Sequence, residues 1–145
     1  MKSKSEYSAE LFNDGFNCGQ SVLAVFSEDY GLDNETALKL TGGVGGGCNL
    51  GELCGAVIGA AQVVGLKHGR HKTEDTGAGK ICDAKVAQFV SEFKAEYGCV
   101  VCRDLLGYDL STEEGRERKW AGDSDSSPCL GFVLSAVEIL ERLGY

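Results

Sequence analysis

Apolar residues recur along most of the chain at the spacing of a helix, and no stretch alternates strictly as a strand does. A helix capped by Asn17 and running to about residue 30 places four apolar side chains on one face: Cys18, Val22, Val25 and Phe26. Residues 76–97 carry a longer apolar stripe: Cys82, Val86, Phe89, Val90, Phe93 and Tyr97. The pattern predicts an all-α fold with these two segments as core helices.

Capping residues and glycines mark the remaining elements. Further helices are predicted at 34–40 after Asp33, 53–69, 102–106, 112–120 after Ser111 or Thr112, and from Pro128 after Ser127. The small polar sequence AGDSDSS, residues 121–127, predicts a mobile loop. Because the connections are short, alternate helices should run in the same direction, in a small up-and-down bundle that forms one domain over residues 1–145.

Glycine is concentrated before the central helix. The segment Gly42 to Gly51, GGVGGGCNLG, has six glycines in ten residues and therefore predicts a loop with unusual backbone angles. Gly51, Gly55 and Gly59 recur every four residues, which predicts a bare helix edge. Close packing of another helix is the favoured use of this edge, and close approach of a cofactor is the alternative.

Composition and charge narrow the class of protein. The 145 residues are 43% apolar, which suffices for a buried core without covalent staples. A net charge of −8 disfavours nucleic acid and anionic membranes as partners and leaves proteins or small cations. The apolar stretch from Leu53 to Leu66 is shorter than the roughly 20 residues that span a bilayer. The start, MKSKSEYSAE, lacks an apolar export segment, so we expect a cytoplasmic protein that is not membrane-embedded.

Cysteine is the residue type with candidate chemistry. Seven cysteines cannot all pair within one chain, and a cytoplasmic setting keeps thiols reduced, so a disulfide framework is disfavoured. Cys82 belongs to the apolar stripe and is expected in the core, whereas Cys48 lies in the glycine-rich loop. Cys99 and Cys102 form a C-x-x-C pair, but the βαβ pattern of thioredoxin-like folds and the second close pair of a zinc site are both absent.

Four cysteines stand at or just before predicted helix starts: Cys18, Cys54, Cys102 and Cys129. A helix start has unpaired N–H groups and the positive end of the helix dipole, which stabilise a thiolate and lower its pKa. Return elements separate these four helices, so their starts should gather at one end of the bundle. The sequence therefore predicts a single four-sulfur site.

The sequence around these cysteines resembles a known family. NCGQSVL around Cys18, CGAVIG from Cys54 to Gly59, CRDLLG from Cys102 and the late Cys129 are similar to the redox-active family named C_GCAxxG_C_C, over roughly residues 8–140. The resemblance implies an all-helical fold, a redox role and these four cysteines as the defining set. A related domain resembles part of the split-Soret cytochromes, which carry an iron–sulfur centre beside their haems, and this favours a cluster.

Three functions compete at this stage. In the first, the four thiolates ligate an iron–sulfur cluster that passes single electrons to a redox partner protein. In the second, the protein is a thiol–disulfide oxidoreductase with Cys54 as an exposed low-pKa attacker and Cys102 as the second catalytic cysteine. In the third, it is a structural metal-binding module or a homodimer formed through the glycine edge. No Ser-His-Asp set, Walker loop or dinucleotide fingerprint supports another enzyme class.

Overall fold

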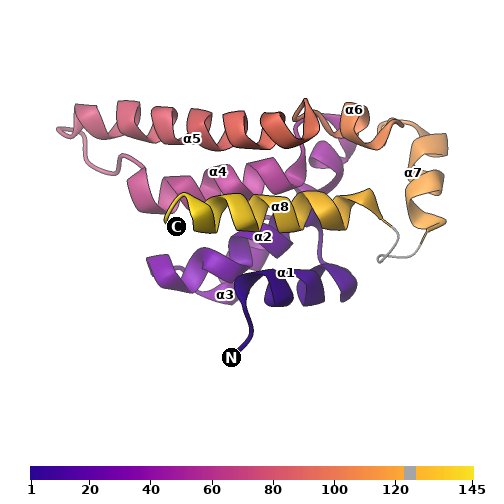
Figure 1. Ribbon diagram of the computed structural model, residues 1–145, viewed down its shortest axis with the longest axis horizontal. Helices are drawn as coiled ribbons and strands as arrows, with labels where there is room; N and C mark the ends of the chain where they lie inside the picture. Colours follow the sequence, from indigo (N-terminus) through magenta and orange to yellow (C-terminus); the bar gives the residue numbers. More distant parts are fainter. Residues whose placement is uncertain (123–126) are drawn as a thin grey trace.

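The computed structural model describes residues 1–122 and 127–145, and the all-α prediction is confirmed (Figure 1). Its α-helices are α1 (Lys4–Asn13), α2 (Cys18–Ser27), α3 (Asn34–Leu40), α4 (Gly55–His68), α5 (Thr76–Tyr97), α6 (Cys102–Leu106), α7 (Glu113–Trp120) and α8 (Pro128–Arg142). A 3-10 turn, η1 (Glu28–Tyr30), extends α2, and a short π-helical turn, η2 (Gly47–Gly51), precedes α4. Part of the predicted AGDSDSS loop, residues 123–126, lies outside the described residues.

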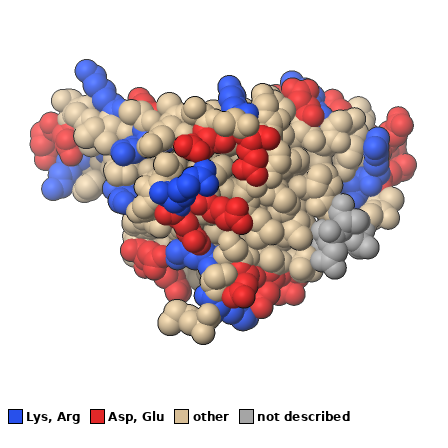
Figure 2. Space-filling model, in the orientation of Figure 1, with Lys and Arg blue, Asp and Glu red and all other residues tan. Residues whose placement is uncertain are grey.

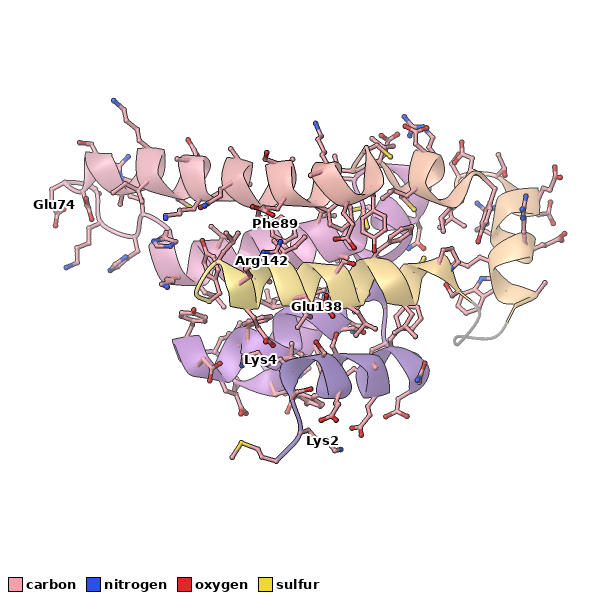
Figure 3. The ribbon with its side chains drawn as sticks, in the orientation of Figure 1. Lys2, Lys4, Glu74, Phe89, Glu138 and Arg142 are labelled. Atoms are coloured by element: carbon pink, nitrogen blue, oxygen red, sulfur yellow. The ribbon has the colours of Figure 1, made fainter. Side chains whose placement is uncertain are left out.

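The long helix α5 runs along one side of the molecule, with α4 and α8 beneath it and α1 to α3 on the opposite side (Figure 1). The short helix α7 stands across one end. Phe89 points from α5 towards α4 and α8 and is fully buried (Figure 3). The predicted apolar faces of α2 and α5 all belong to the core or pack against it, which confirms the helical periodicity.

One helix was not predicted from the sequence. The residues of α1 are mostly polar, and Ser8 and Leu11 alone are buried among them. Ser3 and Glu6 stabilise its start with a capping box, in which the Ser3 hydroxyl accepts from Glu6 N and Ser3 N donates to the Glu6 carboxylate. The Ser8 hydroxyl then donates to the carbonyl of Ser21 at 2.6 Å, which ties α1 to α2.

The surface is strongly charged. Acidic and basic side chains are interspersed over the face shown in Figure 2, and its described residues form no continuous basic tract of the kind that nucleic acid binding needs. Among the described helices, none is both long and apolar enough to cross a membrane.

The glycine edge is used inside the chain, where α2 crosses α4 at close range. A Cβ built on Gly59 would lie 2.8 Å from the Gly19 carbonyl, and one on Gly55 would lie 2.9 Å from the Val44 carbonyl and collide with the Cys18 sulfur. Helix packing is therefore the use of this edge at Gly55 and Gly59, and a dimer contact through it is not available. Gly51 does not belong to the edge, because it lies in η2 with φ of +70°.

The same contacts fix the directions of two helices. Gly19 lies against Gly55, and Val22, one turn further along α2, lies against Gly59 on α4. The two helices therefore run in the same direction, as the up-and-down prediction requires for alternate elements. Both begin at the same end of the bundle, which brings Cys18 next to the start of α4.

A substitution in α4 tests this close crossing. We expect Gly59→Ala to destabilise the protein by about 1–3 kcal/mol, because the new methyl group meets the backbone of α2. Gly65→Ala on the same helix is the matched control, since nothing lies within 4 Å of its Cβ position. It should be neutral or stabilise by up to about 1 kcal/mol through helix propensity. Urea unfolding midpoints measure both effects, and equal effects of the two substitutions would contradict the close crossing.

Candidate functional site

The four predicted cysteines, Cys18, Cys54, Cys102 and Cys129, line one cavity of about 210 Å³. It lies at the end of the bundle where α2, α4, α6 and α8 begin. Three phenylalanines and three leucines contribute to its walls: Phe12, Phe16, Phe132, Leu105, Leu106 and Leu110. The structure therefore brings all four residues of the predicted set to one mostly apolar cavity.

Side-chain caps position two of the cysteines. Cys18 is the first residue of α2, after the N-cap Asn17, whose side chain accepts from Gln20 N at 2.9 Å. The same Asn17 amide donates to the carbonyls of Thr41 and Gly42, at 2.9 and 3.2 Å, which anchors the helix start to the beginning of the glycine-rich segment. Cys129 is the second residue of α8, and its own N–H donates to the Ser127 hydroxyl at 3.2 Å.

A short antiparallel β-bridge positions the other two. Leu53 pairs with Val101, Cys54 N donates to the Val100 carbonyl at 2.8 Å, and Cys102 N donates to the Glu52 carbonyl at 2.5 Å. Because side chains alternate across an extended backbone, Cys54 and Cys102 both point to the face opposite Leu53 and Val101. The starts of α4 and α6 are thus fixed to each other by backbone hydrogen bonds.

An ion pair supports the bridge from the solvent side. The Arg103 guanidinium lies 2.9 Å from the Glu52 carboxylate and donates to the Gly51 carbonyl at 3.2 Å. Sequence reasoning missed the bridge, since a pairing of two or three residues is too short to produce an alternating pattern. The β-branched Val100 and Val101 between two helices were the one available signal.

The glycine-rich loop forms one wall of the cavity. Four consecutive residues, 46 to 49, have left-handed backbone angles with φ between 58° and 64°. This conformation is sterically strained at Cys48 and Asn49, which have a Cβ atom, and unstrained at Gly46 and Gly47, which lack one. Gly46 lines the cavity, and a Cβ there would lie 2.8 Å from the Leu110 side chain. The predicted unusual backbone angles of this segment are confirmed.

Burial dominates the electrostatics of the thiols. It raises the pKa of Cys54 and of Cys102 from 9.0 to about 12 and also raises the pKa of Cys129. The neighbouring Cys18 thiol raises all three further, which reflects how close the four groups are. The backbone N–H groups of Val57 and Ala56 bond to Cys54 and lower its pKa, but burial outweighs them.

Two expectations for the thiols are therefore wrong. Helix starts do not give Cys54, Cys102 and Cys129 low pKa values. Burial destabilises the thiolate more than the N–H groups of the helix start stabilise it. Cys54 is not an exposed attacker either, since only 5% of it is exposed.

The remaining cysteines stay outside the cavity lining. Cys48 is exposed, whereas Cys82 and Cys99 are partly buried, and Cys82 packs against the core as predicted. All seven cysteines are free in the structure. Within residues 1–122 and 127–145, no group of three or more Cys, His, Asp or Glu side chains is placed to hold a metal ion.

Comparison with known proteins gives one match. The family model described as "Putative redox-active protein (C_GCAxxG_C_C)" matches residues 16–143, a range that contains every cysteine of the chain. The chain belongs to this family. The family match begins after α1, so the helix that sequence reasoning missed also lies outside the matched range. No curated protein and no solved structure matches the chain.

The raised thiol pKa values predict a specific loss of stability at high pH. The folded state holds the Cys54 proton up to about pH 12, whereas the unfolded chain releases it near pH 9.0. Stability is therefore complete below pH 9 and falls as pH rises towards 12, by roughly 1.4 kcal/mol per pH unit for each such thiol. Urea unfolding of the reduced, metal-free protein between pH 8 and 11 measures this slope.

Two variants assign that slope to Cys54. Cys54→Ser removes the titrating group, so its stability should fall less steeply with pH than that of the wild type. Cys48→Ser removes an exposed thiol and should leave the slope unchanged. An equal slope in Cys54→Ser and wild type would show that burial of Cys54 does not raise its pKa.

Proposed function

We propose that the protein binds an iron–sulfur cluster through Cys18, Cys54, Cys102 and Cys129 and transfers single electrons to a redox partner protein. The observation that carries the proposal is the cavity itself, which four cysteines from four separate helix starts line together. Membership of a redox-active family supports it. A bound cluster would supply one-electron chemistry, and four cysteine thiolates are its usual ligand set.

The donor set fits a cluster better than a single structural ion. The lining contains no carboxylate or imidazole among the described residues, so sulfur is the ligand type on offer, and soft thiolates select zinc, copper(I) or iron–sulfur clusters. A zinc ion needs four sulfurs at about 2.3 Å from one point. Here the four cysteines line a cavity of about 210 Å³, a space that a polynuclear group would fill.

The cavity walls suit electron transfer. Phe12, Phe16 and Phe132 give the cavity apolar walls, and a low dielectric around a cluster is one of the protein's means of setting its potential. Binding of the cluster must expel the thiol protons, because only thiolates are ligands. The reduced thiols that such loading requires fit the proposed cytoplasmic setting.

Anaerobic reconstitution tests the proposal. Wild-type protein incubated with ferrous iron and sulfide, then desalted, should retain both in stoichiometric amounts. Single Cys→Ser substitutions at 18, 54, 102 and 129 should each lower the affinity for iron by roughly tenfold or more, since even loss of a hydrogen-bond partner of a metal ligand costs about 10- to 100-fold. Cys48→Ser, Cys82→Ser and Cys99→Ser are matched controls outside the cavity lining and should retain wild-type amounts. Wild-type protein that retains neither iron nor sulfide would contradict the proposal.

One observation favours thiol–disulfide exchange as a second candidate. The β-bridge points Cys54 and Cys102 to the same face, as a dithiol pair requires. Their burial and raised pKa act against it, because the attacking species is the thiolate.

Alkylation separates the two candidates. In native metal-free protein at pH 8, iodoacetamide should label the exposed Cys48 at least about tenfold faster than Cys54, because Cys54 is buried and protonated. Peptide mass spectrometry gives the rate at each cysteine. Rapid labelling of Cys54, with a reversible Cys54–Cys102 disulfide after mild oxidation, would favour the oxidoreductase.

A further inference from the structure

Besides its cysteines, the described part of the cavity lining contains one ionisable residue. Among the described residues that line it, Lys119 alone carries a charge at neutral pH. The site would hold up to four thiolates when loaded, so its charge balance depends strongly on any cation placed beside it. The low dielectric of the apolar walls increases the effect of such a charge.

The fold aims Lys119 at the cavity. It lies on α7, which stands across the end of the bundle where the four cysteines gather (Figure 1). Its side chain is half-buried, and its Nζ lies 3.6 Å from the point where a Cβ on Gly46 would stand. The absence of a side chain at Gly46 thus leaves space for the ammonium group next to the glycine-rich wall.

The other cations of α7 have different contacts. The Arg116 guanidinium donates to the carbonyls of Leu110 and Ser111, at 3.2 and 3.0 Å. The Arg118 guanidinium lies over the Tyr108 ring at 4.7 Å. Both are exposed, and neither lines the cavity, which separates Lys119 from an ordinary solvated helix face.

Lys119 shares the cavity with two cysteines from the neighbouring helices. Cys102 is the first residue of α6 and Cys129 the second residue of α8, the helices that flank α7 in the chain, and both line the same cavity as Lys119. An ammonium group among these lining residues favours negative charge in the cavity.

We propose that Lys119 is a positioning residue that supplies the positive charge of the four-cysteine cavity, stabilising anionic sulfur species inside it and attracting anionic molecules to its mouth. The stabilisation of a bound cluster rests on the proposed function, whereas the attraction of anions is a property of the metal-free protein. The two parts can be tested separately.

The metal-free test compares two alkylating reagents of similar size. Iodoacetate is an anion and iodoacetamide is neutral, so the ratio of their rates at one cysteine cancels its thiolate fraction and reports the local charge. Lys119→Gln should lower this ratio at Cys129 about three- to tenfold at low salt, and Lys119→Arg should retain it. Two controls accompany this test. Lys94→Gln removes an exposed charge on α5 and should leave the ratio at Cys129 unchanged, and Lys119→Gln should leave the ratio at the distant Cys82 unchanged.

The second test uses reconstituted protein. The reduction potential of the bound cluster should become more negative in Lys119→Gln, because the reduced form carries the extra electron and loses a stabilising cation. Lys119→Arg and Lys94→Gln should keep the wild-type potential.

The outcomes distinguish the two proposals. An unchanged reagent ratio in Lys119→Gln overturns the role of Lys119, whatever the protein binds. A wild-type protein without iron and sulfide overturns the proposed function, and the reagent ratio still decides whether Lys119 charges the cavity.

Discussion

The close crossing of α2 and α4 is the contact on which the site depends. Gly19, Gly55 and Gly59 let two backbones approach so closely that the Cys18 sulfur lies against the backbone of Gly55. This contact fixes both helices in the same direction and places their starts side by side. Larger residues at these positions would push the helix starts apart and with them two of the four sulfurs. Glycine lowers the stability of a helix. Its presence at these three positions is therefore explained by the close approach of the two backbones that it allows.

The other two cysteines, Cys102 and Cys129, are brought to the cavity by different contacts. The β-bridge between Leu53 and Val101 uses backbone hydrogen bonds to join α6 to α4, and α8 is placed by its apolar face against the core. The thiols thus come from helix starts that are held by a glycine contact, a backbone bridge and ordinary side-chain packing. A cavity remains between them because four helices that converge at their ends cannot fill the space with their own backbones, and the short cysteine side chains leave it open.

Sequence reasoning predicted the helices and the four-cysteine set because each rests on a local signal. Core helices have a period of 3.6 residues, and Asn17, Asp33 and Ser127 cap helices in the structure as they were expected to. The helix α1 was missed because its apolar contribution is short, with Leu11 in the core and Tyr7 and Phe12 packed against it, and because its capping box and the buried Ser8 hydroxyl produce no apolar stripe. The bridge was missed because its partners are 48 positions apart (101 minus 53) and the pairing is too short to show a period.

The thiol pKa values were mispredicted because two effects with opposite sign act at the same atoms. A helix start is a local feature that the sequence displays, and its N–H groups do lower the pKa of Cys54. Burial depends on the packing of α1, α6, α7 and α8 around the cavity, which no local pattern contains. Desolvation has the larger effect because a thiolate loses most of its hydration in an apolar cavity, and the N–H groups of the helix start replace only part of the stabilisation that water gave.

This balance gives the cavity a chemical preference. The neutral form is favoured at Cys54, Cys102 and Cys129, so in the metal-free protein we expect these three thiols to react slowly with oxidants and electrophiles. Thiolates become favourable only when a ligand brings enough positive charge to replace the lost hydration, as iron ions do. A single cation such as Lys119 offsets part of the charge of two thiols and cannot compensate four. The burial that raises the pKa of Cys54, Cys102 and Cys129 in the metal-free protein is therefore also an argument for the proposed metal cluster over a dithiol.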